Sequence, residues 1–136
     1  MSERRKSSFK EQRERIVERL IGEGYLHSQE VIRAMETVPR EEFLPENLRE
    51  TAYVDTPLPI GYGQTISALH MVAMMAEALK LERGQRILEV GCGSGYHAAV
   101  VAEVVAQGVN DERGHVYSIE IVPELVRFAS ENLRRT

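Results

Sequence analysis

The fold of this chain is decided by residues 87–96, which read Ile87-Leu88-Glu89-Val90-Gly91-Cys92-Gly93-Ser94-Gly95-Tyr96. The apolar start is typical of a short buried strand that is covered on both faces. The alternate glycines let the backbone turn sharply and let a ligand approach it closely. We expect a helix over about residues 96–105, whose free N–H groups point back at the turn. Strand, glycine turn and helix N-terminus together predict a cradle for a small cofactor.

The spacing of the glycines discriminates between cofactors. A dinucleotide-binding turn has the pattern G-x-G-x-x-G, and Tyr96 stands where its third glycine would be. No Lys or Arg lies between Arg86 and Arg113, so no nearby basic side chain would bind a phosphate. An acidic residue two positions before G-x-G-x-G instead resembles the first motif of S-adenosylmethionine-dependent methyltransferases, whose cofactor carries no phosphate. A nicotinamide-binding protein and a tight turn without a ligand stay open as alternatives.

The composition limits the class of protein. A chain of 136 residues is long enough for one domain with a real core, and its net charge of −4 gives no general attraction to nucleic acid. The single cysteine, Cys92, excludes an internal disulfide and suits a reducing cytoplasm. No apolar run approaches the roughly 18 residues of a membrane helix. The four histidines lack metal-ligand spacing. We therefore expect a cytoplasmic protein without a metal site and without nucleic-acid or membrane partners.

Helical periodicity marks the N-terminal region. Ser8 and Ser28 are placed to cap two helices, which are expected to end at Gly22 and before Pro39. Over residues 38–63 the periodicity disappears, and four prolines separate short apolar runs. That pattern predicts loops and brief extended segments.

Further elements follow toward the C-terminus. A third helix over about residues 68–79 is apolar nearly all round, so we expect it to be buried, with its methionines filling the core. Residues 107–114 form a polar loop, and residues 115–119 read as a second strand. Pro123 suits the first turn of a last helix.

Two acidic residues flank the glycine turn. Glu120 closes the second predicted strand, where doubly wound folds place an acid for ribose hydroxyls, and it follows Gly95 by 25 residues. A carboxylate that accepts two vicinal hydroxyls makes charge-assisted hydrogen bonds. Glu89 lies two residues before Gly91 and would anchor the turn or attract the ammonium group of the cofactor. The alternative for both is an acid that simply faces water.

A second candidate site lies at residues 64–71, which read QTISALHM. Ser67 is well placed to cap the third helix, and this role alone would explain a serine there. The same helix start would attract a carboxylate to its free N–H groups. Spacing alone does not separate a capping serine from a site for an anionic substrate.

Several segments share their order and spacing with one enzyme family. They are Pro39-Arg40 with Phe43, Tyr53 through Asp55, Leu58-Pro59-Ile60, residues 63–68 (GQTISA), His70-Met71-Val72 and residues 88–95 (LEVGCGSG). They resemble the protein-L-isoaspartate O-methyltransferase family over nearly the whole chain. The resemblance implies an α/β, Rossmann-like methyltransferase fold, incomplete at the C-terminus and with an N-terminal helical extension. Residues 1–80 would carry the substrate-site segment, and residues 81–136 would form the first βαβα part of the cofactor-binding domain.

The resemblance also implies a reaction and a set of residues. The reaction is methyl transfer from S-adenosylmethionine to the α-carboxylate of L-isoaspartyl residues in damaged proteins, a repair reaction. The family's active-site serine falls on Ser67. Apart from the resemblance, His70 would support it in binding the substrate, and the alternative is a buried histidine whose hydrogen bonds are satisfied within the fold. The implied cofactor-binding residues are Gln64, Thr65, Ile66, Glu89, Gly91, Gly93, Gly95 and Glu120.

The chain departs from the family in two ways. Leu69 stands where the family usually has proline, which removes no functional group. The family also continues beyond Thr136 with further strands, so we expect a truncated chain. Two parallel strands are fewer than the roughly 4–6 of a typical sheet, and their unpaired edges favour self-association. The alternatives are a non-catalytic cofactor-binding remnant of such an enzyme and a methyltransferase for small molecules.

Overall fold

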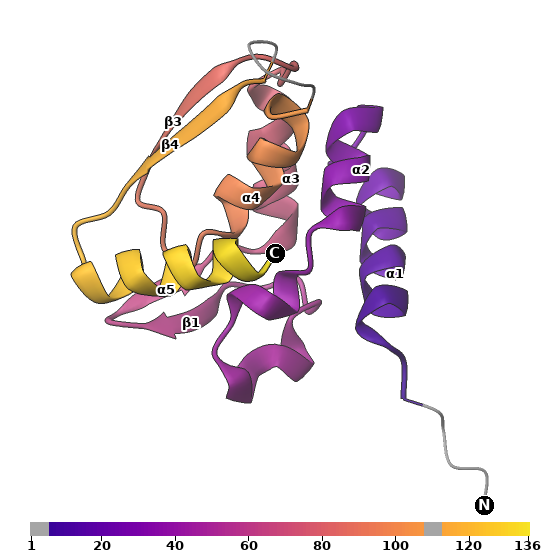
Figure 1. Ribbon diagram of the computed structural model, residues 1–136. Helices are drawn as coiled ribbons and strands as arrows, with labels where there is room; N and C mark the ends of the chain where they lie inside the picture. The colour runs from indigo at the N-terminus through magenta and orange to yellow at the C-terminus, as the bar shows by residue number, and fades with distance from the viewer. Residues whose placement is uncertain (1–5, 108–112) are drawn as a thin grey trace, which may run out of the picture.

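A computed structural model describes residues 6–107 and 113–136 (Figure 1). Most of the polar loop expected over residues 107–114 lies outside the described residues. The elements, in order, are α1 (Phe9–Gly22), α2 (Gln29–Thr37), the 3-10 helices η1 (Arg40–Phe43) and η2 (Glu46–Thr51), β1 (Leu58–Gly61), β2 (Gln64–Ile66), α3 (Leu69–Ala78), β3 (Arg86–Val90), α4 (Tyr96–Val105), β4 (His115–Ile119) and α5 (Pro123–Arg135). The helices and strands predicted from the sequence are confirmed to within two residues at each end.

Both predicted serine caps are present in the N-terminal helices. The Ser8 hydroxyl accepts a hydrogen bond from the Glu11 amide at 3.1 Å, and α1 follows it. The Ser28 hydroxyl accepts from the Val31 amide at 3.4 Å at the start of α2. Each cap satisfies one of the amides that a helix start leaves without a partner.

The region between α2 and α3 contains a hairpin that the sequence did not reveal. β1 pairs antiparallel with β2, whereas the sequence pattern gave residues 64–66 only as a lead into α3. Gly61, Tyr62 and Gly63 all have positive φ angles, of 92°, 56° and 70°, and form the turn. A three-residue strand exists only through its partner, so its own pattern carries too little signal.

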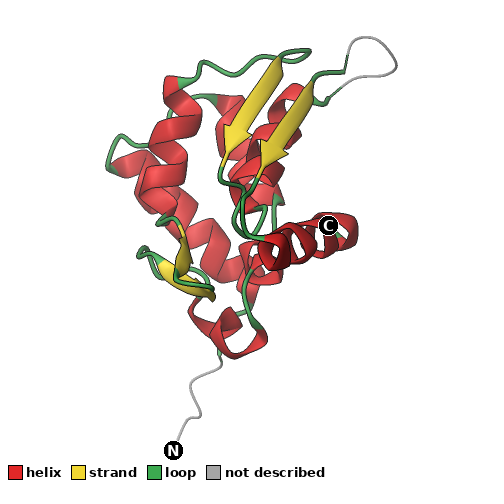
Figure 2. Cartoon of the chain, turned by 90° about the vertical axis from the view of Figure 1, so that its left-hand side faces the viewer, coloured by secondary structure: helices red, strands yellow, loops and turns green. Residues whose placement is uncertain are grey.

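The second half of the chain begins a parallel sheet. β3 and β4 pair in parallel with Ile87 opposite Val116, and α4 makes the crossover between them. Figure 2 shows the two strands with the helices gathered behind them. This arrangement leaves one face of the sheet without a covering element among the described residues.

Two expectations about burial are wrong. The strand at residues 86–90 is not covered on both faces, since Leu88 is 66% exposed and Val90 is 76% exposed. The third helix is not buried all round either. The methionines exposed along it are Met71, Met74 and Met75. The physical reason is the same in both cases: α4 packs on one side of a two-stranded sheet and α3 packs on α2 and α4, so residues directed elsewhere meet solvent.

The core lies among the first four α-helices and the strands that they cover. It is apolar, with fully buried residues such as Leu20, Met35, Leu69, Val100 and Val105. No helix in the described part of the chain combines the length and apolar character needed to span a membrane.

One carboxylate joins α3 to the start of α2. Glu77 Oε1 accepts hydrogen bonds from the amides of His27 and Ser28 at 3.1 and 3.0 Å, and from the Ser28 hydroxyl at 3.0 Å. Burial alone would raise the pKa of Glu77, but these hydrogen bonds outweigh it and lower the pKa below its usual value. The ionised group therefore stabilises the folded state.

We expect Glu77→Gln to lower the free energy of unfolding at pH 7 by about 1–3 kcal/mol, because the amides of His27 and Ser28 lose a charged acceptor whose side chain is only 8% exposed. The wild-type advantage should be full above about pH 5 and should disappear as the pH falls through the lowered pKa. Denaturant unfolding of both proteins at several pH values measures this. Glu82→Gln, at an exposed position, is the matched control, and an equal loss in both variants would contradict the role of Glu77.

Candidate functional site

The glycine turn after β3 is held in an unusual backbone conformation. Gly91, Gly93 and Gly95 have φ angles of 85°, 52° and 88°, in the left-handed region that favours glycine. The amides of Gly91 and Cys92 donate to the Ile119 carbonyl at 2.8 and 3.2 Å. The turn is thereby fastened to the end of β4, and Gly95 forms the N-cap of α4.

Glu120 faces this turn, as the strand-end position predicted. Its Oε1 accepts from the Gly93 amide at 3.1 Å, and its Oε2 accepts from the amides of Ile121 and Val122 at 2.9 and 3.2 Å. The Gly93 hydrogen bond is the main cause that lowers the pKa of Glu120. The carboxylate is therefore ionised at neutral pH, and its oxygens have further lone pairs to accept hydroxyl groups.

Glu89 lies in a different environment. Its Oε1 accepts from the Ser118 hydroxyl at 2.8 Å, on the neighbouring strand. Burial raises the pKa of Glu89, and the negative charge of Glu120 raises it further. The two acids thus differ in how readily each one ionises, although both lie beside the turn.

A cavity of about 550 Å³ joins the glycine turn to the segment before α3. It brings together these predicted site residues: Thr65, Ile66, Ser67, Glu89, Gly91 and Gly93. Tyr96 and His97, at the start of α4, also line it. The lining does not include four other predicted site residues, which are Gln64, His70, Gly95 and Glu120.

Ser67 does not cap α3, so of the two alternatives left open by the spacing the capping role is excluded. Ala68 is the N-cap residue, and no side chain makes a capping hydrogen bond there. The Ala68 carbonyl accepts from the amides of Met71 and Val72, so the helix begins one residue later than a serine cap requires. The exposed Ser67 side chain is left beside the cavity.

His70 is held by a carboxylate on the preceding loop. Its Nδ1 lies 2.9 and 3.0 Å from the two Asp55 carboxylate oxygens, and its backbone amide donates to Asp55 Oδ1 at 2.9 Å. Although burial acts to raise it, the pKa of Asp55 is lowered by these hydrogen bonds from His70. The Tyr25 ring lies 5.5 Å away. The pairing with Asp55 holds His70 outside the cavity lining that contains Ser67.

Two residues that the structure places at key positions have no role that the sequence pattern indicates. Asp55 belongs to a segment shared with the family, and in the structure it fixes His70. Arg40 belongs to another such segment, and its guanidinium donates to the Ser67 carbonyl at 2.9 Å. Both contacts join residues at least 15 positions apart, so local spacing carries no signal for them. The only signal in the sequence is that Arg40 lies in a predicted loop with prolines and short apolar runs, which is at most a hint of a tertiary contact.

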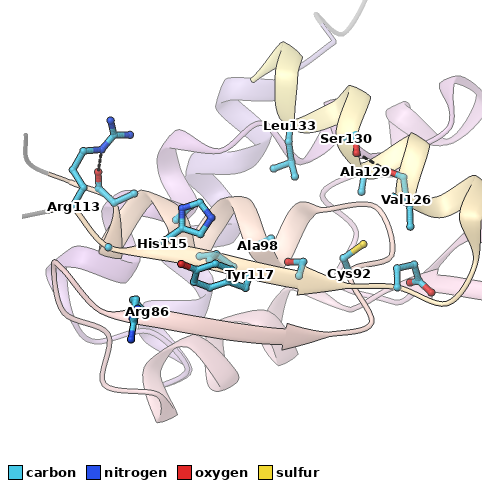
Figure 3. Close-up of a pocket in the computed structure, with 16 residues that line it drawn as sticks. Arg86, Cys92, Ala98, Arg113, His115, Tyr117, Val126, Ala129, Ser130 and Leu133 are labelled. Atoms are coloured by element: carbon cyan, nitrogen blue, oxygen red, sulfur yellow. Dashed lines mark hydrogen bonds between the residues drawn. The ribbon is translucent and has the colours of Figure 1, made fainter. Parts of the chain in front are cut away.

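A larger cavity of about 790 Å³ runs along the outer edge of β4 (Figure 3). His115 and Tyr117 lie on one side of it. The side chains of α5 that line it are Val126, Ala129, Ser130 and Leu133. It borders a strand edge that has no partner strand among the described residues, and it meets the glycine turn only at Cys92. Within those residues no cluster of His, Cys, Asp and Glu is placed to hold a metal ion.

Comparison with known proteins decides the family. The model of the family described as protein-L-isoaspartate(D-aspartate) O-methyltransferase matches residues 11–136, nearly the whole chain. The chain belongs to the protein-L-isoaspartate(D-aspartate) O-methyltransferase family. The resemblance noted in the sequence is thereby confirmed, and so is the Rossmann-like methyltransferase fold class.

Members of this methyltransferase family are closely similar in sequence to this chain over the residues that align with it. The protein-L-isoaspartate O-methyltransferase of Hyperthermus butylicus is 61% identical over 129 residues, which is 93% of this chain and 54% of that protein. The enzyme of Staphylothermus marinus is 54% identical over 131 residues, or 96% of this chain and 58% of that protein. The chain spans about half the length of the curated relatives that it matches.

Solved structures of the methyltransferase family share the fold. A Plasmodium falciparum protein described as a protein-L-isoaspartate O-methyltransferase superposes with a TM-score of 0.78 at 32% identity. The match covers 90% of this chain and 55% of that one, whose crystal structure contains S-adenosyl-L-homocysteine.

We expect Gly95→Ala to destabilise the fold by about 1–3 kcal/mol, because it forces a side chain into a left-handed backbone. The added Cβ would also lie 3.3 Å from side-chain atoms of Ala129 and Leu133 on α5. Thermal unfolding measures the loss. Gly22→Ala is the control, since nothing lies within 4 Å of its Cβ position, and there we expect no loss. Equal melting temperatures for the two variants would contradict the strain at Gly95.

Proposed function

We propose that the glycine turn binds S-adenosylmethionine and that the adjoining segment at Ser67 binds the α-carboxylate of an L-isoaspartyl residue, which is methylated. The observation that carries the proposal is the shared cavity, which has Ser67 and the turn in one lining. Family membership supports the reaction. The bound S-adenosyl-L-homocysteine of the Plasmodium falciparum structure supports the cofactor.

The residues at the turn suit this cofactor. The cavity volume of about 550 Å³ lies in the range of small-molecule sites, roughly 300–1,000 Å³. Half-buried Glu89 would attract the ammonium group. Ionised Glu120 lines the neighbouring cavity of about 790 Å³, so it would accept the ribose hydroxyls of a cofactor that extends past the glycine turn. Thr65 and Ile66 line the cavity and would contact the cofactor directly. Gln64 is outside the lining, so its contact would need the hairpin to move toward the turn.

The chemistry places modest demands on the protein. S-adenosylmethionine supplies a methyl group bonded to a positively charged sulfur. A substrate carboxylate oxygen forms the new bond to that carbon, the carbon–sulfur bond breaks, and its electron pair stays on sulfur. The carboxylate is already nucleophilic, so no strong base is needed, and most of the acceleration comes from alignment. Ser67 would orient the carboxylate by a hydrogen bond, and His70, fixed by Asp55, would support the same region.

The two regions of the chain would have separate roles in the proposed reaction. Residues 1–80 would carry the acceptor segment, and residues 81–136 would carry the cofactor turn. Isoaspartyl proteins and peptides would be the partners. A single cysteine and a net charge of −4 support a cytoplasmic protein that does not rely on nucleic acid.

We expect S-adenosyl-L-homocysteine to bind the purified chain in calorimetry and Glu120→Gln to weaken that binding by about tenfold or more, because charge-assisted hydrogen bonds are lost. Binding by wild type should be constant down to about pH 5 and should weaken below, as the lowered pKa of Glu120 is approached.

Ser67→Ala should bind the cofactor and lose about a hundredfold in methyl transfer to an isoaspartyl peptide. Glu82→Gln is the matched control.

Three outcomes would distinguish the alternatives. A wild-type chain that binds the cofactor without transferring methyl would favour a binding remnant. A chain that binds NADH tightly instead would contradict the cofactor assignment. Transfer to small carboxylic acids, but not to isoaspartyl peptide, would contradict the substrate assignment.

We also propose that the uncovered face of the sheet associates with a second copy of the chain. Its exposed apolar residues are Leu88, Val90, Tyr117 and Ile119, and Ile121, just beyond the end of β4, is 95% exposed. Apolar patches and unpaired strand edges of this kind favour association. The two outer edges of the β3–β4 sheet lack partner strands within the part of the chain that the structure describes.

We expect sedimentation equilibrium to show a concentration-dependent dimer or larger species for wild type. Leu88→Lys should shift it toward monomer, because a charge placed in the patch must be desolvated on association. Met74→Lys, a similar change at an exposed apolar position on α3, is the control and should leave the association unchanged. A wild-type monomer at all concentrations would contradict this proposal.

A further inference from the structure

Arg40 is a charged side chain with no exposed surface. Burying an ion costs several kcal/mol unless it is paired or well hydrogen-bonded. The guanidinium of Arg40 uses main-chain carbonyls rather than a carboxylate: Nε donates to the Ala52 carbonyl at 2.7 Å and one terminal nitrogen donates to the Ser67 carbonyl at 2.9 Å. The other terminal nitrogen is buried without a hydrogen-bond partner. Such an arrangement is a poor source of stability.

The same guanidinium contacts the helix that follows the glycine turn. Its central carbon lies 4.9 Å from the centre of the Tyr96 ring, and Tyr96 is the first residue of α4. One rigid planar group therefore contacts the backbone of Ser67 and the start of the cofactor helix. A lysine could not do this, because its ammonium lacks the fixed fork of donors.

The main chain of Arg40 is fixed as well. Its amide donates to the Tyr53 hydroxyl at 3.1 Å, and that hydroxyl donates to the buried Glu41 carboxylate. Burial, together with the hydrogen bond to Glu41, raises the pKa of Tyr53, so the phenol keeps its proton and continues to donate. Arg40 is thus held at both ends, which suits a group that sets the position of others.

We propose that Arg40 is a positioning residue for methyl transfer, which holds Ser67 at a set place relative to the cofactor turn. The inference rests on the proposed function. The Ser67 carbonyl belongs to the peptide that leads into Ala68, so fixing it fixes the direction of the Ser67 side chain. In-line transfer is sensitive to such placement, and an error of about 1 Å can cost roughly a hundredfold in rate.

The test compares Arg40→Lys with Glu77→Gln, which removes a carboxylate that binds the start of α2 and is not part of the cavity lining. Both are assayed at the same interval below their own melting temperatures. We expect Arg40→Lys to lose about 10–100-fold in kcat, with S-adenosyl-L-homocysteine still bound at close to wild-type affinity. Glu77→Gln should keep wild-type kcat. If Arg40→Lys does not fold, Tyr53→Phe removes the hydroxyl that accepts from the Arg40 amide, outside the cavity lining, and should lower kcat in the same way.

A second readout follows Ser67 itself. The three-bond coupling between the amide and α protons of Ser67, measured by NMR, should indicate one backbone conformation in wild type and in Glu77→Gln, and a changed or averaged one in Arg40→Lys. An unchanged coupling in Arg40→Lys, or an equal loss of kcat in Glu77→Gln, would overturn the positioning role alone. A wild-type chain that neither binds the cofactor nor transfers methyl would overturn the proposed function, and the positioning role with it.

Discussion

The hydrogen bond from the Gly93 amide to the Glu120 carboxylate connects the parts of this structure on which the candidate site depends. It spans from the end of one parallel strand to the end of the next, and the Ile119 carbonyl reinforces it by accepting two further amides of the turn. Only a backbone with left-handed glycines can present its amides in this way. The result is a turn whose shape is set by both strands, and which in turn sets where α4 begins.

A second, buried network fixes the segment that contains Ser67. Arg40 contacts Ala52, Ser67 and Tyr96, which belong to three separate parts of the chain. The energetic cost of burying a guanidinium without a carboxylate partner is offset only in part by main-chain carbonyls and an aromatic face. The buried guanidinium therefore contributes little to stability, but it holds Ser67 and Tyr96, which line the same cavity, in a fixed arrangement. Such arrangements are common at sites where alignment matters more than binding strength.

The open face of the sheet has a different origin. Parallel strands are normally covered by helices on both faces, and apolar residues such as Leu88 and Val90 suit that environment. Here the described residues place helices on only one face of the β3–β4 sheet, as Figure 2 shows. The same side chains that would form a core therefore lie in solvent. The exposed methionines of α3 follow the same reasoning, since burial depends on what packs against a residue as well as on its own character.

The sequence by itself determined the local structure: the capped helices, the two parallel strands, the glycine turn, and the acid that ends the second strand. These follow from periodicity, capping residues and backbone preferences, which act over a few positions. Tertiary structure alone decided that Gln64–Ile66 pairs as a strand, that Ser67 lines a cavity without capping its helix, that Asp55 fixes His70, and that Arg40 bridges the site. Each of these depends on partners far along the chain, and pairings of that kind leave no periodic trace in a single sequence.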